Sequence, residues 1–220
     1  MLAEDHLLTG GAVDLLAKGG PVMALLLLVS IGALAIVLVK LYQFWRARLG
    51  RNSFIEPVIA SLARGDREAA LNTLEYEPHP VARVMRVAVR IGQDTRLSQD
   101  EREAEIARVG TAEIRQLESL LRWLEVIANL SPLLGLLGTV LGMITAFAKL
   151  ESAGAKVDPA LLAGGIWEAL LTTAFGLVIA IPALAAFYMF DGRVETVRAT
   201  MKDAVVRVLG STSTGTASAN

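Results

Sequence analysis

Residues 131–147, SPLLGLLGTVLGMITAF, form an uncharged stretch in which small side chains recur at helical spacing. On a helix these residues share one face: Gly135, Gly138, Thr139, Gly142 and Ala146. In lipid such a face lets two backbones approach closely, because packing and hydrogen bonds, rather than a hydrophobic force, hold membrane helices together. The stretch therefore predicts a membrane helix that needs a close partner.

A suitable partner follows in residues 164–182, GGIWEALLTTAFGLVIAIP, which repeat the mixture of small and apolar residues. We expect the two helices to pack through four glycines, Gly135, Gly138, Gly142 and Gly176. Together they are predicted to line a polar path through a membrane.

The charged residues are segregated from three apolar runs. The chain of 220 residues is 54% hydrophobic and 20% charged, with a mean hydropathy of +0.51. Three runs reach the roughly 20 residues that a membrane-spanning helix needs, and we place the spans at 21–45, 123–149 and 159–190. Acidic residues precede the first run and no cleavage motif follows it, so we expect a retained span rather than a signal peptide. The predicted fold is an all-α membrane protein with three transmembrane helices and long helices extending into the cytoplasm.

The residues after the first span predict its orientation. Aromatic side chains are followed by Arg46, Arg48 and Arg51, as is typical of a cytoplasmic edge. Residues 46–122 are then a cytoplasmic helical region, and the N-terminus lies on the opposite side. The remaining predicted segments are an amphipathic external segment at 1–20, an external loop at 150–158, a cytoplasmic helix at 191–210 and a disordered tail at 211–220.

Capping signals divide the cytoplasmic region into helices. Ser53 with Glu56 and Ser98 with Glu101 have the spacing of capping boxes, and Asp66 is a good N-cap for the helix after it. The EPHP turn at 77–80 ends that helix. No breaker lies between 98 and Pro132, which predicts an uninterrupted helix running from the cytoplasm into the second span.

Four polar side chains in the spans are candidates for an ion pathway: Thr139, Glu168, Thr172 and Thr173. A carboxylate within a span is costly and usually faces protein or water, although Glu168 lies close enough to the outer edge to meet headgroups instead. Each threonine hydroxyl could instead bond a carbonyl of its own helix. Thr139 and Thr173 lie beside small-residue faces at similar predicted depth, which favours a pore lining.

Residues near the cytoplasmic end of the spans are candidates for a vestibule: Asn129, Ser131, Pro132 and Pro182. Each proline can kink its helix and free a carbonyl. Proline is also common in membrane helices without such a role.

Other chemistry is absent from the pattern. There is no cysteine, and His6 and His79 are far apart, so we expect no metal site and no cofactor. No nucleophile or phosphate-binding motif indicates an enzyme, and no basic, aromatic-rich stripe indicates nucleic-acid binding. Glu168 is the only ionisable residue in the apolar cores of the spans, so a proton path would need a central acid from a partner.

The two blocks quoted above, SPLLGLLGTVLGMITAF and GGIWEALLTTAFGLVIAIPA, resemble the conserved blocks of the MotA/TolQ/ExbB proton-channel family, in particular its ExbB and TolQ branch. The resemblance implies a homopentamer in the bacterial inner membrane, with its N-terminus periplasmic and its C-terminus cytoplasmic. It implies that the second and third spans surround a pore holding single-span helices of an ExbD- or TolR-like partner, which carries a membrane aspartate. Thr139 and Thr173 match the family's pore threonines, and Glu168 matches its third-span glutamate.

The resemblance further implies an ExbB-like motor subunit that uses the proton-motive force to energise TonB-dependent outer-membrane transport. Membrane lipids and a TonB- or TolA-like protein are the other implied partners. The chain departs from many relatives at Gly164-Gly165, where they have proline-glycine, and at Thr172, whose extra hydroxyl would also suit sodium. Alternative readings are a TolQ-like envelope-stability motor, another stator, or a membrane scaffold that conducts no ions.

Overall fold

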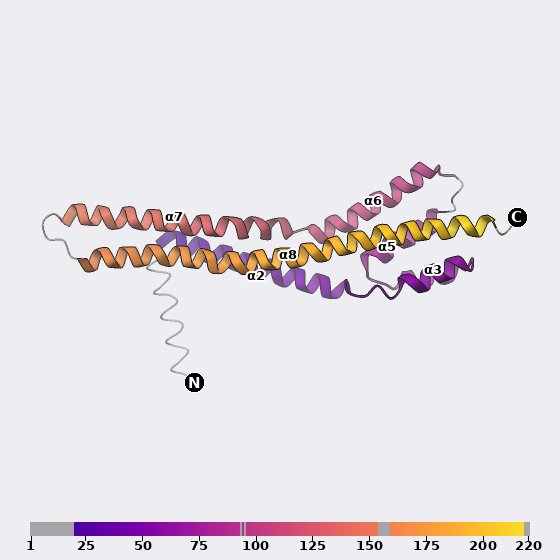
Figure 1. Ribbon diagram of the computed structural model, residues 1–220, viewed down its shortest axis with the longest axis horizontal. Helices are drawn as coiled ribbons and strands as arrows, with labels where there is room; N and C mark the ends of the chain where they lie inside the picture. Colours follow the sequence, from indigo (N-terminus) through magenta and orange to yellow (C-terminus); the bar gives the residue numbers. More distant parts are fainter. Residues whose placement is uncertain (1–19, 93, 95, 154–158, 218–220) are drawn as a thin grey trace, which may run out of the picture. The chain divides into compact units, whose positions relative to one another are not determined.

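The computed structural model describes residues 20–92, 94, 96–153 and 159–217. Every regular element in these ranges is an α-helix (Figure 1): α2 (Gly20–Arg46), α3 (Ile55–Ala63), α4 (Arg67–Glu75), α5 (Pro80–Ile91), α6 (Gln99–Glu118), α7 (Leu121–Ala153) and α8 (Pro159–Ala217). Helices α2, α7 and α8 contain segments long and apolar enough to cross a membrane. The all-α fold with three candidate transmembrane helices and additional long helices is therefore confirmed.

The chain forms two compact units. Of the described residues, the first contains those within 20–38 and 120–188, and thus most of α2, all of α7 and the first half of α8. The second contains the described residues within 39–119 and 189–217, and thus α3 to α6 with the last turns of α2 and the second half of α8.

Apolar side chains of the first unit face outward. Only 17%, 17% and 28% of the three most apolar windows are buried, and side chains such as Leu28, Ile144 and Val178 are at least 60% exposed. A water-soluble monomer rarely exposes so large an apolar surface. These faces are suited to lipid or to other membrane helices.

The second unit has a core of its own. Helix α5 is strongly amphipathic and buries Val81, Val84, Met85 and Ala88. Helix α8 contributes apolar residues at every third or fourth position: Val194, Val197, Met201, Ala204 and Val208. Three ion pairs connect helices of this unit at its surface: Arg83 with Glu113, Arg198 with Glu118, and Arg207 with Glu56.

Two of the three predicted helix caps are present. Asp66 accepts from the backbone of Ala69 at 3.0 Å, and Ser98 and Glu101 form a reciprocal capping box. The Ser53–Glu56 box is wrong: the N-cap of α3 is Phe54 and no side chain caps it. Glu56 instead forms a two-pronged ion pair with Arg207 of α8, at 2.7 and 2.8 Å.

The uninterrupted helix predicted before Pro132 is also wrong. Helix α6 ends at Glu118 and α7 begins at Leu121, and Leu120 between them has φ of +67°. Helix ends leave carbonyls without intrahelical donors, and here Lys40 and Gln43 of α2 donate to the carbonyls of Leu117 (2.7 Å) and Gln116 (3.3 Å). Tertiary donors thus satisfy the end of α6 and stabilise a break that no local residue signals.

Helix α8 is continuous through the third predicted span and the predicted C-terminal helix, and it ends at Ala217. Helix therefore replaces the predicted disordered tail over residues 211–217. The predicted amphipathic segment lies outside the described residues up to 19, as do residues 154–158 of the predicted external loop.

Candidate functional site

Helices α7 and α8 pack through glycines at van der Waals limits. A Cβ atom placed on Gly176 would lie 2.5 Å from the carbonyl oxygen of Ser131, and one on Gly135 would lie 2.9 Å from that of Thr172. Further along, Cβ atoms on Gly142 and Gly165 would lie 2.9 and 2.6 Å from the Cβ atoms of Ala169 and Ala146. Residue numbers rise along α7 as they fall along α8, so the helices are antiparallel (Figure 1).

We call this contact the glycine seam, defined by five residues: Gly135, Gly138, Gly142, Gly165 and Gly176. No side chain larger than hydrogen fits at these positions without movement of the opposite helix. The structure thus places all four glycines that the sequence analysis assigned to helix packing at one interface. Backbones this close gain dispersion contacts that lipid chains cannot supply.

Thr172 lies inside the seam. Its side chain is 2% exposed, and its Oγ1 donates to the carbonyl oxygen of Ala169 at 2.6 Å, with the carbonyl oxygen of Gly135 on α7 at 3.3 Å. A Cβ atom on Gly138 would lie 2.5 Å from that hydroxyl. Within this chain, Thr172 therefore serves close helix packing and does not reach an open surface.

Thr139 and Thr173 flank the seam at similar depth. Thr139 follows Gly138 and Thr173 follows Thr172, so each is one residue from the same contact. With a rise of 1.5 Å per residue in opposite directions, the two lie about 3 Å apart along the helix axes. This register agrees with the depth that the sequence analysis predicted for the pair.

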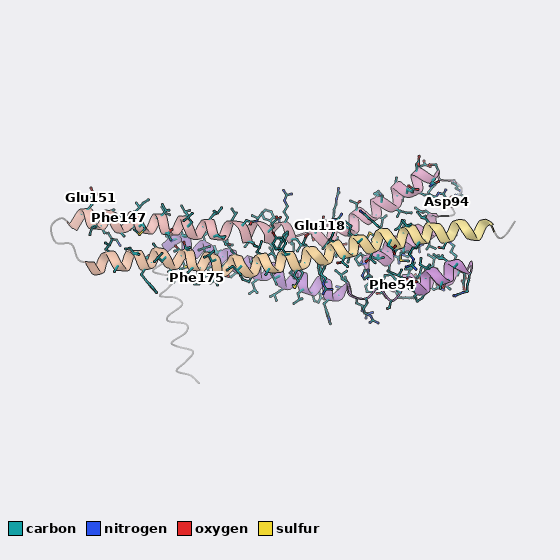
Figure 2. The ribbon with its side chains drawn as sticks, in the orientation of Figure 1. Phe54, Asp94, Glu118, Phe147, Glu151 and Phe175 are labelled. Carbon is teal, nitrogen blue, oxygen red and sulfur yellow. The ribbon has the colours of Figure 1, made fainter. Side chains whose placement is uncertain are left out.

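The two hydroxyls differ in their partners. Oγ1 of Thr139 donates to the carbonyl oxygen of Leu136 at 2.7 Å. Thr139 also borders a hollow of about 640 Å³ that extends along α7 to Phe147 and Glu151, two residues that Figure 2 labels. Oγ1 of Thr173 is buried and has no hydrogen-bond partner among the described residues. An unpaired buried hydroxyl is costly, so Thr173 is the seam-flanking group that a partner or water would most stabilise.

Glu168 lies on another side of α8. It precedes Ala169, which packs against Gly142, and it is half-buried. Five residues separate it from Thr173, which places the two side chains about 140° apart around the helix and about 7.5 Å apart along it. In the described part of the chain Glu168 makes no hydrogen bond or ion pair. A single lumen touching both groups would therefore have to be completed by other helices.

The four candidate vestibule residues are dispersed. Ser131 is buried in the seam, where its Oγ donates to Ile127 at 2.7 Å. Asn129 and Pro182 are exposed, and Pro132 is half-buried. Both prolines lie inside helices that continue past them. Within one chain these residues do not enclose a common space.

Lys40 is a buried polar centre that the sequence analysis did not single out. Its side chain is fully buried, and Nζ donates to the carbonyl oxygen of Leu117 at 2.7 Å and to Oε1 of Gln43 at 2.9 Å. It also lies 5.9 Å from the ring centre of Phe44. The sequence signal that could have indicated this polar centre is a lysine followed three residues later by a glutamine, at the end of an apolar run.

His79 is a second buried polar residue of the same unit. It caps α5, with Nδ1 accepting from the backbone of Val81 at 3.2 Å, and it packs against Phe54. Burial lowers the pKa of His79, and a backbone interaction with Leu49 opposes this in part. Among the described residues, no cluster of three acidic or histidine side chains could hold a metal ion.

Comparison with known proteins places these elements in a family. Residues 77–203, which include α7 and the seam-forming part of α8, match the model of the MotA/TolQ/ExbB proton channel family. The chain belongs to this family. A protein of Synechocystis named ExbB-like 1, a biopolymer transport protein, is 33% identical over 80% of this chain and 68% of its own length.

Two other members of the MotA/TolQ/ExbB family illustrate its range. An ExbB homologue from Methanothermobacter thermautotrophicus, also named as a biopolymer transport protein, is 29% identical over 84% of this chain. The aligned part spans 65% of that relative, slightly less than two thirds. The Tol-Pal system protein TolQ of Haemophilus influenzae is 41% identical over 39% of this chain and 37% of its own length. The family is described as one of proton channels rather than of enzymes.

Proposed function

We propose that this chain is an ExbB-like subunit of an inner-membrane, ion-driven motor. With an ExbD-like partner it would use the proton-motive force to energise TonB-dependent outer-membrane transport. Membership of the MotA/TolQ/ExbB family supports the channel role, and the relatives named ExbB support the branch. The observation that carries the proposal is the register of the glycine seam, which holds Thr139 and Thr173 at similar depth on two closely packed helices.

The lumen is proposed to form between copies of the chain. Thr172 is enclosed in the seam, and the buried Oγ1 of Thr173 has no hydrogen-bond partner among the described residues, so these residues offer no continuous path within one chain. In a homopentamer, α7 and α8 of neighbouring copies would surround a centre in which Thr139 and Thr173 meet water and the guest helices. The guest would supply a central acid, which the spans lack, because proton transfer needs a titrating group or water at each step.

The proposed orientation puts the end of α2 in the cytoplasm. Arg46, Arg48 and Arg51 follow the span directly, where the positive-inside rule is most reliable. The N-terminus and the 150–158 loop would then be periplasmic, and the C-terminal half of α8 would be cytoplasmic. The membrane would be the bacterial inner membrane, as the family's energy source requires.

A TolQ-like role in envelope stability is the second candidate. The similarity to TolQ of Haemophilus influenzae, confined to 85 residues, supports it. The two roles share the channel and differ in the partner, which would be TolR- and TolA-like rather than ExbD- and TonB-like. Identifying the single-span protein that co-purifies with the full chain separates them.

Proton uptake by vesicles tests the channel role. The complex is reconstituted with its co-purified partner, and uptake under an imposed membrane potential is followed with a pH-sensitive dye. We expect uptake that is lost when the partner's membrane aspartate is replaced by asparagine. Absence of uptake from both preparations would favour a scaffold that conducts nothing, and equal uptake in both would contradict the role of the partner's aspartate.

Glu168 provides a test within this chain. Glu168→Ala is expected to abolish energised transport, because it removes a half-buried carboxylate from the proposed ion pathway. The complex should still assemble. Glu125→Ala is the matched control, since Glu125 is exposed on α7 and has no bonded partner among the described residues. Wild-type transport in Glu168→Ala would remove Glu168 from the pathway.

A further inference from the structure

Three arginines surround a hollow at the C-terminal end of α2. The hollow has a volume of about 550 Å³ and is lined by Phe44, Trp45, Arg46, Arg48, Leu49, Gly50 and Arg51. Helix α2 ends here: Arg48 has φ of +49°, and the backbone N–H of Leu49 donates to the carbonyl oxygen of Phe44 at 3.4 Å. We call Arg46, Arg48 and Arg51 the arginine cluster.

The charge of the arginine cluster is not neutralised by the described part of the chain. None of its three guanidinium groups makes an ion pair or hydrogen bond there, and Arg46, Arg48 and Arg51 are all exposed. Two other arginines of the same unit, Arg83 and Arg207, are instead paired with Glu113 and Glu56. Adjacent like charges repel one another, so this arrangement favours an external anion.

The surroundings of the cluster indicate where that anion would come from. Trp45 is 77% exposed and Tyr42 is 59% exposed, and both lie in the last turns of a candidate membrane span. Exposed tryptophan and tyrosine at the end of a span are typical of the headgroup layer. Leu38 and Leu41, also exposed, continue the apolar surface back along α2. A ligand with a phosphate and acyl chains matches both parts of this surface.

We propose that the arginine cluster binds the phosphodiester headgroup of an anionic phospholipid. Guanidinium groups bind phosphate oxygens through paired, charge-assisted hydrogen bonds, and basic residues beside a span attract acidic lipids. Trp45 would lie against the glycerol region, and the acyl chains would follow the exposed leucines of α2. This binding does not depend on ion conduction, so the lipid proposal is tested independently of the proposed motor function.

Fluorescence quenching tests the site on the full chain. Trp123→Phe and Trp167→Phe, both at exposed positions, leave Trp45 as the only tryptophan of the chain. Quenching of Trp45 by brominated phosphatidylglycerol is compared with quenching by brominated phosphatidylcholine in mixed micelles. We expect a preference for phosphatidylglycerol on the order of tenfold to 100-fold at low salt, which decreases as salt is added.

The variants separate the arginine cluster from general positive charge. R46Q/R48Q/R51Q should lose the preference, whereas R90Q/R96Q/R115Q, which removes three other exposed arginines of the same unit, should keep it. If the first variant does not fold, R51Q alone should lose part of the preference. Retention of the preference in R46Q/R48Q/R51Q, or in R51Q when only that variant folds, would overturn the proposal, as would an equal loss in the control.

Competition distinguishes lipid from a soluble anion. Inorganic phosphate and glycerol phosphate at millimolar concentration should not displace brominated phosphatidylglycerol, because neither contacts the apolar surface of α2. Displacement by either would overturn the lipid assignment and leave a small-anion site.

Discussion

Gly138 of α7 and Thr172 of α8 face each other in the glycine seam. A Cβ atom on Gly138 would lie 2.5 Å from Oγ1 of Thr172 and 2.7 Å from its Cβ. The threonine side chain occupies the space that the glycine leaves open. Its hydroxyl lies within reach of two carbonyls, one from each helix. This pairing fixes the register of α7 against α8, and with it the depth of Thr139 relative to Thr173.

Gly138→Ala should therefore disrupt the seam. Overpacking of a close contact typically costs about 1–3 kcal/mol, and we expect a lower unfolding temperature of the purified complex. Thr172→Gly should restore part of the loss when combined with it, because it removes the atoms that clash. Gly32→Ala is the control, since a Cβ atom there meets nothing within 4 Å. Equal stability of Gly138→Ala and Gly32→Ala would contradict the observed register.

Thr173→Val should abolish proton transport without lowering the stability of the complex. The substitution conserves shape and removes a buried hydroxyl without a partner in the described chain, so stability should be unchanged or raised by about 1 kcal/mol. We expect proton uptake to be lost and to return in Thr173→Ser. Thr145→Val is the matched control, because Thr145 is exposed and its hydroxyl donates to the carbonyl oxygen of Leu141 of its own helix. Normal uptake by Thr173→Val would place this hydroxyl outside the pathway.

Lys40→Met should loosen the end of α6. It removes the donor to the carbonyl of Leu117, and an unsatisfied buried acceptor costs roughly 1–3 kcal/mol. We expect faster trypsin cleavage after Arg115 and Arg122, which lie on either side of the break, together with a lower unfolding temperature. Lys202→Met, at an exposed site, should change neither. Identical cleavage rates in the two variants would show that Lys40 does not hold this end.

His79 should make the second unit sensitive to acid. Its folded pKa is lowered, chiefly by burial, so between that pKa and about 6.5 the unfolded chain binds more protons than the folded chain. Stability should then decrease as the pH falls below about 6.5, and the hydrogen bond from Val81 to Nδ1 should be lost on protonation.

Thermal unfolding of the full chain at pH 7.5 and 5.5 measures this effect. His79→Asn keeps a side chain suited to the N-cap and should reduce the difference in unfolding temperature. His6→Asn replaces the other histidine of the chain and should retain it. An unchanged difference in His79→Asn would assign the acid sensitivity to carboxylates.

Local signals in the sequence were reliable where the structure uses only neighbouring residues. The Asp66 cap and the Ser98–Glu101 box involve side chains three residues apart, and both are present. The Ser53–Glu56 prediction was wrong because Arg207, 151 residues away, binds the Glu56 carboxylate. The break at Leu120 was missed for the same reason, since its support comes from Lys40 and Gln43 of α2.

The sequence by itself determined the three apolar helices and the small-residue faces of α7 and α8, because hydropathy and helical periodicity are properties of consecutive residues. Only the tertiary structure decided that Thr172 lies inside the seam, that the Thr173 hydroxyl has no partner in the described part of the chain, and that Lys40 donates to the end of α6. Periodicity assigns a side chain to a face of its helix. Which atoms that face meets depends on the rotation and register of a second helix, and these are set by the close contacts of residues far apart in the chain.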